Sequence, residues 1–278
     1  MQINDNVLEH VTKGFQIPPK PETLDKVQKL AKQPNVNPAE IGHCIASDVG
    51  LSASILRTLN SPFFGMARSI TDVKQATVLL GVNSVLNLVA THEIKKSMSG
   101  KSCISLERFW DNASETAEMM VHIGKIVNPN IPLEDLHIAG LFHDCGLPAM
   151  SIKFPDYIEV LKESNSTPEK SIIELEEKRY TTNHAVIGYY IASSWGLPKD
   201  LCNLVLRHHD SEVLNTQSSG TFEWMYAVLK IADNLIQKSR SHQDSEDWLA
   251  VKEDVLSFIG MNHDDYNNIE EDLCEMQC

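Results

Sequence analysis

The spacing of apolar residues predicts helices along almost the whole chain. Apolar side chains recur at steps of three and four residues, which places them on one face of an α-helix. One such stripe consists of Leu51, Ile55, Leu56 and Leu59. No run of alternating apolar and polar residues is long enough to indicate a β-sheet. The sequence therefore predicts an all-α fold.

Residues that favour helix ends divide the first hundred positions into short helices. Asn37 can cap a helix whose first turn contains Pro38 and Glu40 and which runs through Ile45. The same rules predict further boundaries: a start at Asp48 or Ser52, a break at residues 61–65, a cap at Thr71-Asp72, and an interruption at Gly81 before a helix that continues toward Lys95.

A polar joint at residues 100–105 predicts a boundary between two helical lobes. Residues 1–100 form the first lobe in this interpretation and residues 101–240 form the second. The acidic segment 241–278 is expected to hold one more helix, at 246–259, and a frayed end. The helices expected in the second lobe lie near 106–127, 133–143, 155–164, 168–180, 184–195, 198–209 and 222–239.

Charge and composition narrow the function classes. The chain has 278 residues, of which 42% are apolar, and its 24 basic and 38 acidic residues give a net charge of −14. Such a surface repels phosphate backbones and anionic lipid, so we expect binding neither to a nucleic-acid polymer nor to a membrane. A small nucleotide stays a candidate ligand. Six dispersed cysteines and the lack of a signal peptide or a bilayer-length apolar run lead us to expect a cytoplasmic protein with reduced thiols.

Histidine and aspartate residues of the second lobe are the strongest candidates for chemistry. His143 and Asp144 end an apolar helix just before Gly146, and Asp233 lies on or beside the apolar face of a later helix. Imidazole and carboxylate together suit Zn, Fe or Mn. Histidines of the core that hydrogen-bond to backbone carbonyls are the alternative interpretation. The other candidates are His184, His208 and His209.

Several motifs occur together in the order of one known family. They are residues 17–21, 48–61, 63–65, 70–76, 79–81, 139–146, 183–188 and 195–198, and the His208-His209 pair. From about residue 15 to about residue 238 the chain resembles the HDOD domain, a relative of the HD-domain metal-dependent phosphohydrolases. The resemblance implies an all-helical fold in which an HD-like lobe follows another helical lobe.

The resemblance also implies a set of metal ligands. HD phosphohydrolases hold a metal with an early histidine, the His-Asp pair and a late aspartate, and Asn112 occupies the early position here. An amide oxygen is a poorer ligand than imidazole for Zn or Fe. We therefore expect either a divalent metal, Fe, Mn or Zn, or none. The candidate ligands, with second-metal positions included, are His143, Asp144, Asp233, His184, His208 and His209.

Two further departures affect the expected activity. Leu147 follows Gly146 where many two-metal relatives have a lysine, and the Gly-Tyr-Pro signature of the related cyclic-dinucleotide hydrolases is missing. The sequence thus favours a bacterial-type signalling or regulatory module that acts by binding a protein partner, with no catalytic residue assigned. The alternatives are a metal-dependent phosphomonoesterase or phosphodiesterase with a nucleotide-type substrate, and a nucleotide sensor without turnover.

Three smaller predictions concern packing. The acidic run 174–177 is expected to be the solvated face of a helix. Cys145 is expected to be a small buried thiol rather than a metal ligand. Phe63 and Phe64 are expected to pack into the core.

Overall fold

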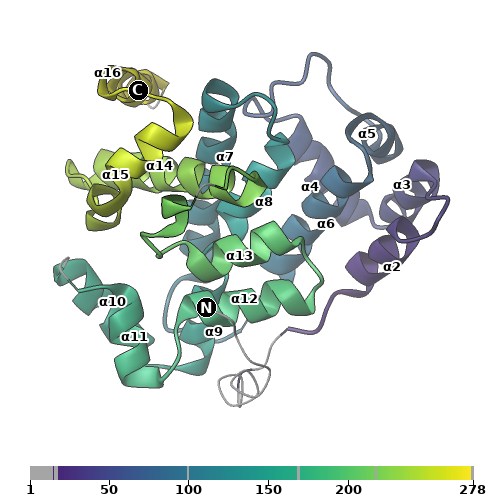
Figure 1. Ribbon diagram of the computed structural model, residues 1–278. Coiled ribbons are helices and arrows are strands. Elements are labelled where there is room, and N and C mark those ends of the chain that lie inside the picture. The colour runs from purple at the N-terminus through teal and green to yellow at the C-terminus, as the bar shows by residue number, and fades with distance from the viewer. Residues whose placement is uncertain (1–14, 16–17, 99, 168–169, 217, 277–278) are drawn as a thin grey trace.

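The structure is a computed structural model that describes residues 15, 18–98, 100–167, 170–216 and 218–276. Every regular element within these residues is a helix, so the predicted all-α fold is confirmed (Figure 1). The helices are α2 (Glu22–Ala31), α3 (Pro38–Ala46), α4 (Val49–Leu59), α5 (Val73–Leu80), α6 (Val82–Ser97), α7 (Leu106–Val127), α8 (Leu133–Phe142), α9 (Gly146–Lys153), α10 (Tyr157–Ser166), α11 (Ile172–Tyr180), α12 (His184–Ser194), α13 (Lys199–Arg207), the short η1 (Val213–Asn215), α14 (Thr221–Ser241), α15 (Glu246–Ile259) and α16 (His263–Met276).

Side-chain caps fix the helix starts that the sequence predicted in the first hundred residues. The Asn37 side chain accepts a hydrogen bond from the Ala39 amide, and Asp48 rather than Ser52 caps α4. Each cap satisfies an amide that has no partner within its helix. Gly81 separates α5 from α6 with a φ of 85°, a value that disfavours residues with a side chain.

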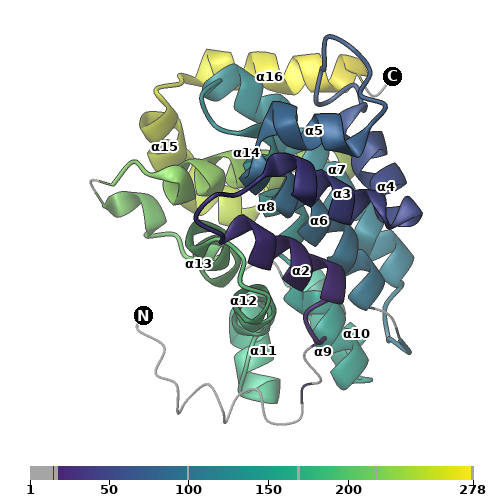
Figure 2. The same cartoon turned by 90° about the vertical axis from the view of Figure 1, so that its right-hand side faces the viewer.

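Helices α7 and α8 run through the centre of the molecule (Figure 1). They approach closely because Gly140 has no side chain: a Cβ atom there would lie 2.6 Å from the Ala117 Cα atom. Helices α2 to α6 lie on one side of this pair, and α16 and α11 lie at opposite ends of the molecule (Figure 2). Apolar side chains from all these parts form one continuous core.

Polar and aromatic contacts join the N-terminal helices to the rest. The Asn87 amide of α6 donates to the Asp135 carboxylate of α8 over 2.6 Å. Phe64 is buried, as predicted, and its ring packs against the His137 ring of α8 at 5.5 Å between centroids. The Gln28 side chain of α2 donates to the Trp195 carbonyl oxygen at the end of α12. The two predicted lobes therefore share an extensive junction.

The C-terminal segment is more ordered than the sequence suggested. The expected helix at 246–259 is α15, but the prediction of a frayed end was wrong for residues 263–276, which form α16. Tyr266 of α16 is buried and stacks on Trp248 of α15, with 5.1 Å between ring centroids. None of the described helices is long and apolar enough to cross a bilayer.

Candidate metal centre

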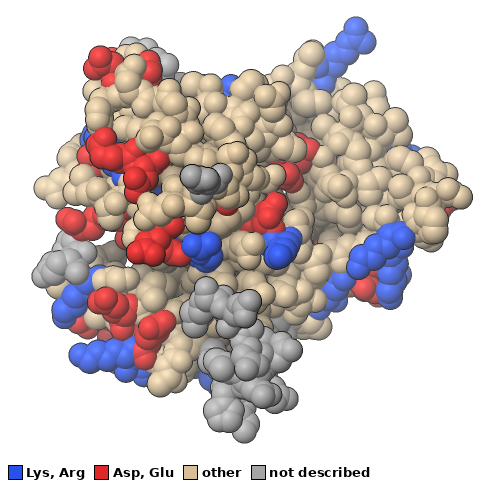
Figure 3. Space-filling view, viewed as in Figure 1, with Lys and Arg blue, Asp and Glu red and all other residues tan. Residues whose placement is uncertain are grey.

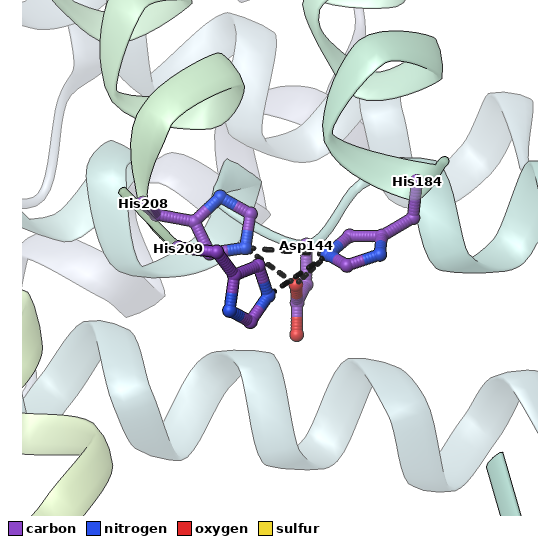
Figure 4. A group of neighbouring side chains, drawn as sticks. All are labelled: Asp144, His184, His208 and His209. Atoms are coloured by element: carbon purple, nitrogen blue, oxygen red, sulfur yellow. Dashed lines mark hydrogen bonds and ion pairs between the residues drawn. The ribbon is translucent and has the colours of Figure 1, made fainter. Parts of the chain in front are cut away.

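Four of the predicted ligands converge on one point (Figure 4). Asp144 follows the end of α8, His184 begins α12, and His208 and His209 follow α13. One ligand atom from each residue lies within 4.8 Å of all the others. His184 Nε2 is 3.3 Å from His208 Nε2 and 3.2 Å from His209 Nε2, while Asp144 Oδ1 is 3.2 Å from His208 Nε2. We call these four residues the histidine cluster.

Local structure sets the position of His184. The Asn183 side chain accepts a hydrogen bond from the Val186 amide over 2.9 Å, so it caps α12 and makes His184 the first helical residue. Gly146, at the start of α9, faces the same turn. A Cβ atom there would lie 1.9 Å from the His184 carbonyl oxygen. Only glycine lets α9 and α12 approach enough to bring Asp144 to His184.

Each imidazole of the cluster is oriented through its other nitrogen. His184 Nδ1 donates to Glu176 over 2.8 Å, and His209 Nδ1 donates to Asp247 over 2.8 Å. His208 Nδ1 donates to the Val205 carbonyl oxygen over 2.9 Å. Carbonyl and ionised carboxylate oxygens only accept, so Nδ1 carries the hydrogen in all three rings. The three Nε2 atoms are thereby directed at the common point, as in metal-bound histidines.

The charges around the cluster favour a cation at its centre. Burial lowers the pKa of His184, but the carboxylates of Glu176 and Asp144 outweigh this effect and raise the pKa to about 10. Burial and the neighbouring His209 hold the pKa of His208 well below its usual value. Burial also lowers the pKa of His209. His208 and His209 thus favour their neutral forms, whereas the carboxylates beside His184 favour a positive charge at its ring, which a proton or a metal ion can supply.

Glu176 is the largest departure from the sequence-based expectation. The acidic run 174–177 was predicted to be solvated, but the Glu176 side chain is fully buried. It accepts hydrogen bonds from the Tyr157 hydroxyl and from the backbone amide and Nδ1 of His184. A sequence signal for this burial exists: Glu176 lies four residues after Ile172, on the same helix face.

A second group of candidate metal ligands, His143 and Asp233, lies on the other side of Asp144. His143 Nδ1 donates to the Gly140 carbonyl oxygen over 2.7 Å. His143 Nε2 lies 3.4 Å from Asp144 Oδ2 and 4.0 Å from Asp233 Oδ1. Burial lowers the pKa of His143, but these two carboxylates prevail and raise it to about 9. Asp144 therefore presents one oxygen to the histidine cluster and the other to His143.

Asn112 is engaged by another side chain. Its Oδ1 atom accepts a hydrogen bond from the Arg240 guanidinium over 3.1 Å, and Arg240 also pairs with Glu115. Asn112 and Arg240 line the same cavity as His143 and Asp233. The positive charge of Arg240 therefore lies in the wall of the cavity that His143 and Asp233 face.

The cavity beside both groups has a volume of about 700 Å³. Its wall includes three basic residues, Lys170, Lys230 and Arg240. Figure 3 shows that acidic side chains gather on the part of the surface that carries α14 and α15. The cavity lining also includes the acidic residues Asp233, Glu246 and Asp247, so it offers both signs of charge to a ligand.

Comparison with known proteins identifies the family. A profile of the HDOD domain matches residues 17–211. The chain belongs to the HDOD domain family. An uncharacterised protein of Treponema pallidum (strain Nichols) is 26% identical to this HDOD protein over 201 residues, which are 70% of this chain and 38% of that relative. The chain thus spans well under half the length of this curated relative.

Solved structures share the fold. An HDOD domain protein of unknown function from Geobacter sulfurreducens has a TM-score of 0.69 at 20% identity and covers 96% of this chain and 92% of its own. A Shewanella amazonensis protein whose name suggests a metal-dependent phosphohydrolase has a TM-score of 0.64 at 17% identity, with 96% of both chains covered. A Marinobacter aquaeolei protein whose name suggests signal transduction has a TM-score of 0.69 at 16% identity, with 98% of this chain and 62% of its own covered.

The structure places the other five predicted ligands in two groups beside Asp144, the three histidines of the cluster on one side and His143 with Asp233 on the other, and their binding of a metal stays a prediction. Sequence reasoning missed Glu176, Tyr157 and Asp247, which act through other residues. Cys145 is fully buried, as predicted, and its thiol donates to the Gly188 carbonyl oxygen over 3.7 Å. Burial raises the pKa of this thiol, which disfavours a thiolate ligand.

Proposed function

We propose that this HDOD protein is a regulatory module in which one divalent metal ion stabilises the HD-like lobe and a signalling protein binds to that lobe. Asp144, His184, His208 and His209 would hold the ion. Three imidazoles and one carboxylate suit Zn, Fe or Mn, and the hydrogen bonds at Nδ1 already aim the three Nε2 atoms. When bound, the ion supplies a positive charge and joins three separate segments of the lobe.

The contact between Asn112 and Arg240 is the observation that favours regulation over hydrolysis. The resemblance to HD phosphohydrolases implies an early histidine as partner of His143, Asp144 and Asp233. Here the amide oxygen of Asn112 is a weaker ligand and already accepts a hydrogen bond from a guanidinium. The Arg240 guanidinium, which Glu115 partly neutralises, also adds positive charge where a second metal ion would lie. A two-metal mechanism is therefore disfavoured.

The experiment compares turnover and metal content before and after a histidine is introduced at position 112, where HD phosphohydrolases have their early histidine. Wild-type protein loaded with Mn, Fe or Zn is expected to bind one ion and to leave phosphomonoesters, phosphodiesters and nucleotides unhydrolysed. The double variant Asn112→His, Arg240→Gln is expected to bind a second ion, because an imidazole replaces the amide and the repelling charge is removed. Arg240→Gln alone is the control and should still bind one ion.

The cavity favours a second candidate function, metal-dependent phosphoester hydrolysis. Lys170, Lys230 and Arg240 can offset the charge of a nucleotide-type substrate next to Asp144. A bound ion would lower the pKa of a water molecule in such a reaction. Turnover in the wild type that is lost in His143→Ala would establish this function and contradict the regulatory proposal.

A further inference from the structure

Helix α15, which follows the HD-like lobe in the sequence, reaches the histidine cluster. Asp247, in its first turn, accepts the Nδ1–H of His209 over 2.8 Å and lies 3.3 Å from Lys230 Nζ of α14. The HDOD profile ends at residue 211, so Asp247 lies outside the matched region. A helix beyond that region thus orients one of the candidate metal ligands.

The start of α15 is anchored to α14 next to the site. Asn234 of α14 is fully buried, and its side-chain oxygen accepts from the Ser245 amide over 2.8 Å. The Asn234 amide group donates to Asp244 and to the Tyr266 hydroxyl, each over 2.9 Å. Ser245 in turn caps α15 by accepting from the Trp248 amide. These contacts hold the first turn of α15 next to His209.

His209 depends on α15 in a way that the other two histidines do not. Val205, the acceptor for His208, lies on the same helix end, and Glu176, the acceptor for His184, is buried inside the lobe. The Asp247 side chain is 52% exposed, so its position is set by the docking of α15 rather than by surrounding core. Removal of α15 from α14 would leave His209 Nδ1 without its acceptor.

We propose that Asp247 is a positioning residue that couples the docking of α15 to metal binding at the histidine cluster. The inference rests on the proposed function, since it requires a metal at that cluster. Docked α15 fixes His209 with Nε2 free to bind the ion, and the bound ion in turn holds His209 and α15 in place. Because such coupling is reciprocal, a signalling partner that displaces α15 would weaken metal binding.

The test measures Zn²⁺ affinity of the full chain by competition with a chromophoric chelator. Loss of the carboxylate that orients a metal-bound histidine typically weakens metal affinity 10–100-fold, and we expect a loss of about that size in Asp247→Ala. The matched control is Asp254→Ala, which removes an exposed carboxylate from the same helix. It should bind Zn²⁺ like the wild type. Hydrogen exchange of the α15 amides should slow by a similar factor when Zn²⁺ is added to the wild type.

A second measurement needs no metal. Long-range ¹H–¹⁵N NMR of the metal-free protein reports which nitrogen of His209 carries the hydrogen. We expect Nδ1–H in the wild type and in Asp254→Ala, and a mixture of tautomers in Asp247→Ala, because the acceptor is gone. A merely structural role for Asp247 would leave this signature unchanged.

Lys230 is the other charged group that faces Asp247, and a double variant separates its effect. If Asp247 acts only by neutralising Lys230, adding Lys230→Met to Asp247→Ala would restore Zn²⁺ affinity. Positioning of His209 predicts no restoration. Restored affinity would overturn the proposal.

The remaining outcomes distinguish this proposal from the proposed function. Wild-type affinity together with an unchanged His209 tautomer in Asp247→Ala would overturn the coupling and leave the metal site intact. Wild-type Zn²⁺ binding no tighter than that of His184→Ala would overturn both.

Discussion

Buried histidines in this molecule differ in the partners that surround them. His184 lies between two carboxylates, which raise its pKa to about 10. His137 of α8 is buried between the two parts of the molecule, and its Nδ1 atom has no hydrogen-bond partner among the described residues. Burial, followed by the charge of Lys95, lowers the pKa of His137 to about 4. The same side chain thus favours its protonated form at one place, beside two carboxylates, and its neutral form at another, inside the core.

The low pKa of His137 predicts a loss of stability in acid. Between about pH 6.5 and pH 4 the unfolded chain binds a proton at this residue and the folded chain does not, so acidification favours unfolding. The variant His137→Phe removes that proton. Its free energy of unfolding, relative to the wild type, should therefore rise by about 1 kcal/mol per pH unit as the pH falls through this range. Urea denaturation at several pH values measures the difference.

The control for this prediction is His43→Phe, which changes an exposed histidine of α3. It makes the same substitution at the surface, and the pH-dependent gain in stability should be larger for His137→Phe than for His43→Phe. Parallel pH profiles for His137→Phe and the wild type would show that His137 titrates normally in the folded protein.

At the scale of elements, close helix approaches bring the site together. The turn between α8 and α9 carries Asp144, and Gly146 lets α12 come close enough to add His184. A residue with a side chain at position 146 would overlap the backbone of α12. The ligand geometry thus depends on one helix crossing.

The variant Gly146→Ala tests that crossing. Its Cβ atom would meet the His184 carbonyl oxygen, and backbone cannot move aside as a side chain can. We expect a loss of about 1–3 kcal/mol in the free energy of unfolding, measured by urea denaturation. Gly50→Ala, in the exposed first turn of α4, is the control and should not destabilise, because alanine favours helix more than glycine. Equal stability of Gly146→Ala and the wild type would contradict the described packing.

The sequence predicted those elements whose boundaries depend on local chemistry. Asn37, Asp48 and Asp72 cap helices where expected, because a cap needs only its own side chain and the next few amides. The sequence did not predict α16 or the burial of Glu176. Tyr266 anchors α16 by packing on Trp248, and Glu176 meets partners from two other helices. The spacing from Ile172 places Glu176 on an apolar helix face, but the partners that stabilise its buried carboxylate, like those of Tyr266, come from distant segments and cannot be deduced from that spacing.

For the candidate site, the residue types were predictable but their grouping was not. The sequence assigned His143 and Asp144 to one metal position and gave His184, His208 and His209 only as further candidates. The structure places both histidines with His184 on the other oxygen of Asp144. Whether imidazoles converge depends on how α12 and α13 pack, which the sequence alone does not specify.

On the scale of the whole molecule, one continuous core extends across the predicted boundary at residues 100–105. We therefore expect one cooperative unfolding transition. All four tryptophans lie after residue 105, so tryptophan fluorescence reports on the second part and, through Trp195, on its contact with Pro18 and Gln28, whereas far-UV circular dichroism reports on helices of both parts. The two urea unfolding curves should coincide. Separate midpoints would show that residues 1–100 unfold independently.

The central claim is that a single metal ion is bound by Asp144 and three histidines. X-ray absorption spectroscopy of the Zn²⁺-loaded full chain, with metal content measured on the same sample, tests it most directly. We predict one ion per chain in a shell of imidazole nitrogens and oxygen, at distances near 2.0–2.1 Å, and loss of that ion in His184→Ala. A metal-free chain, or two ions per chain in the wild type, would contradict the account.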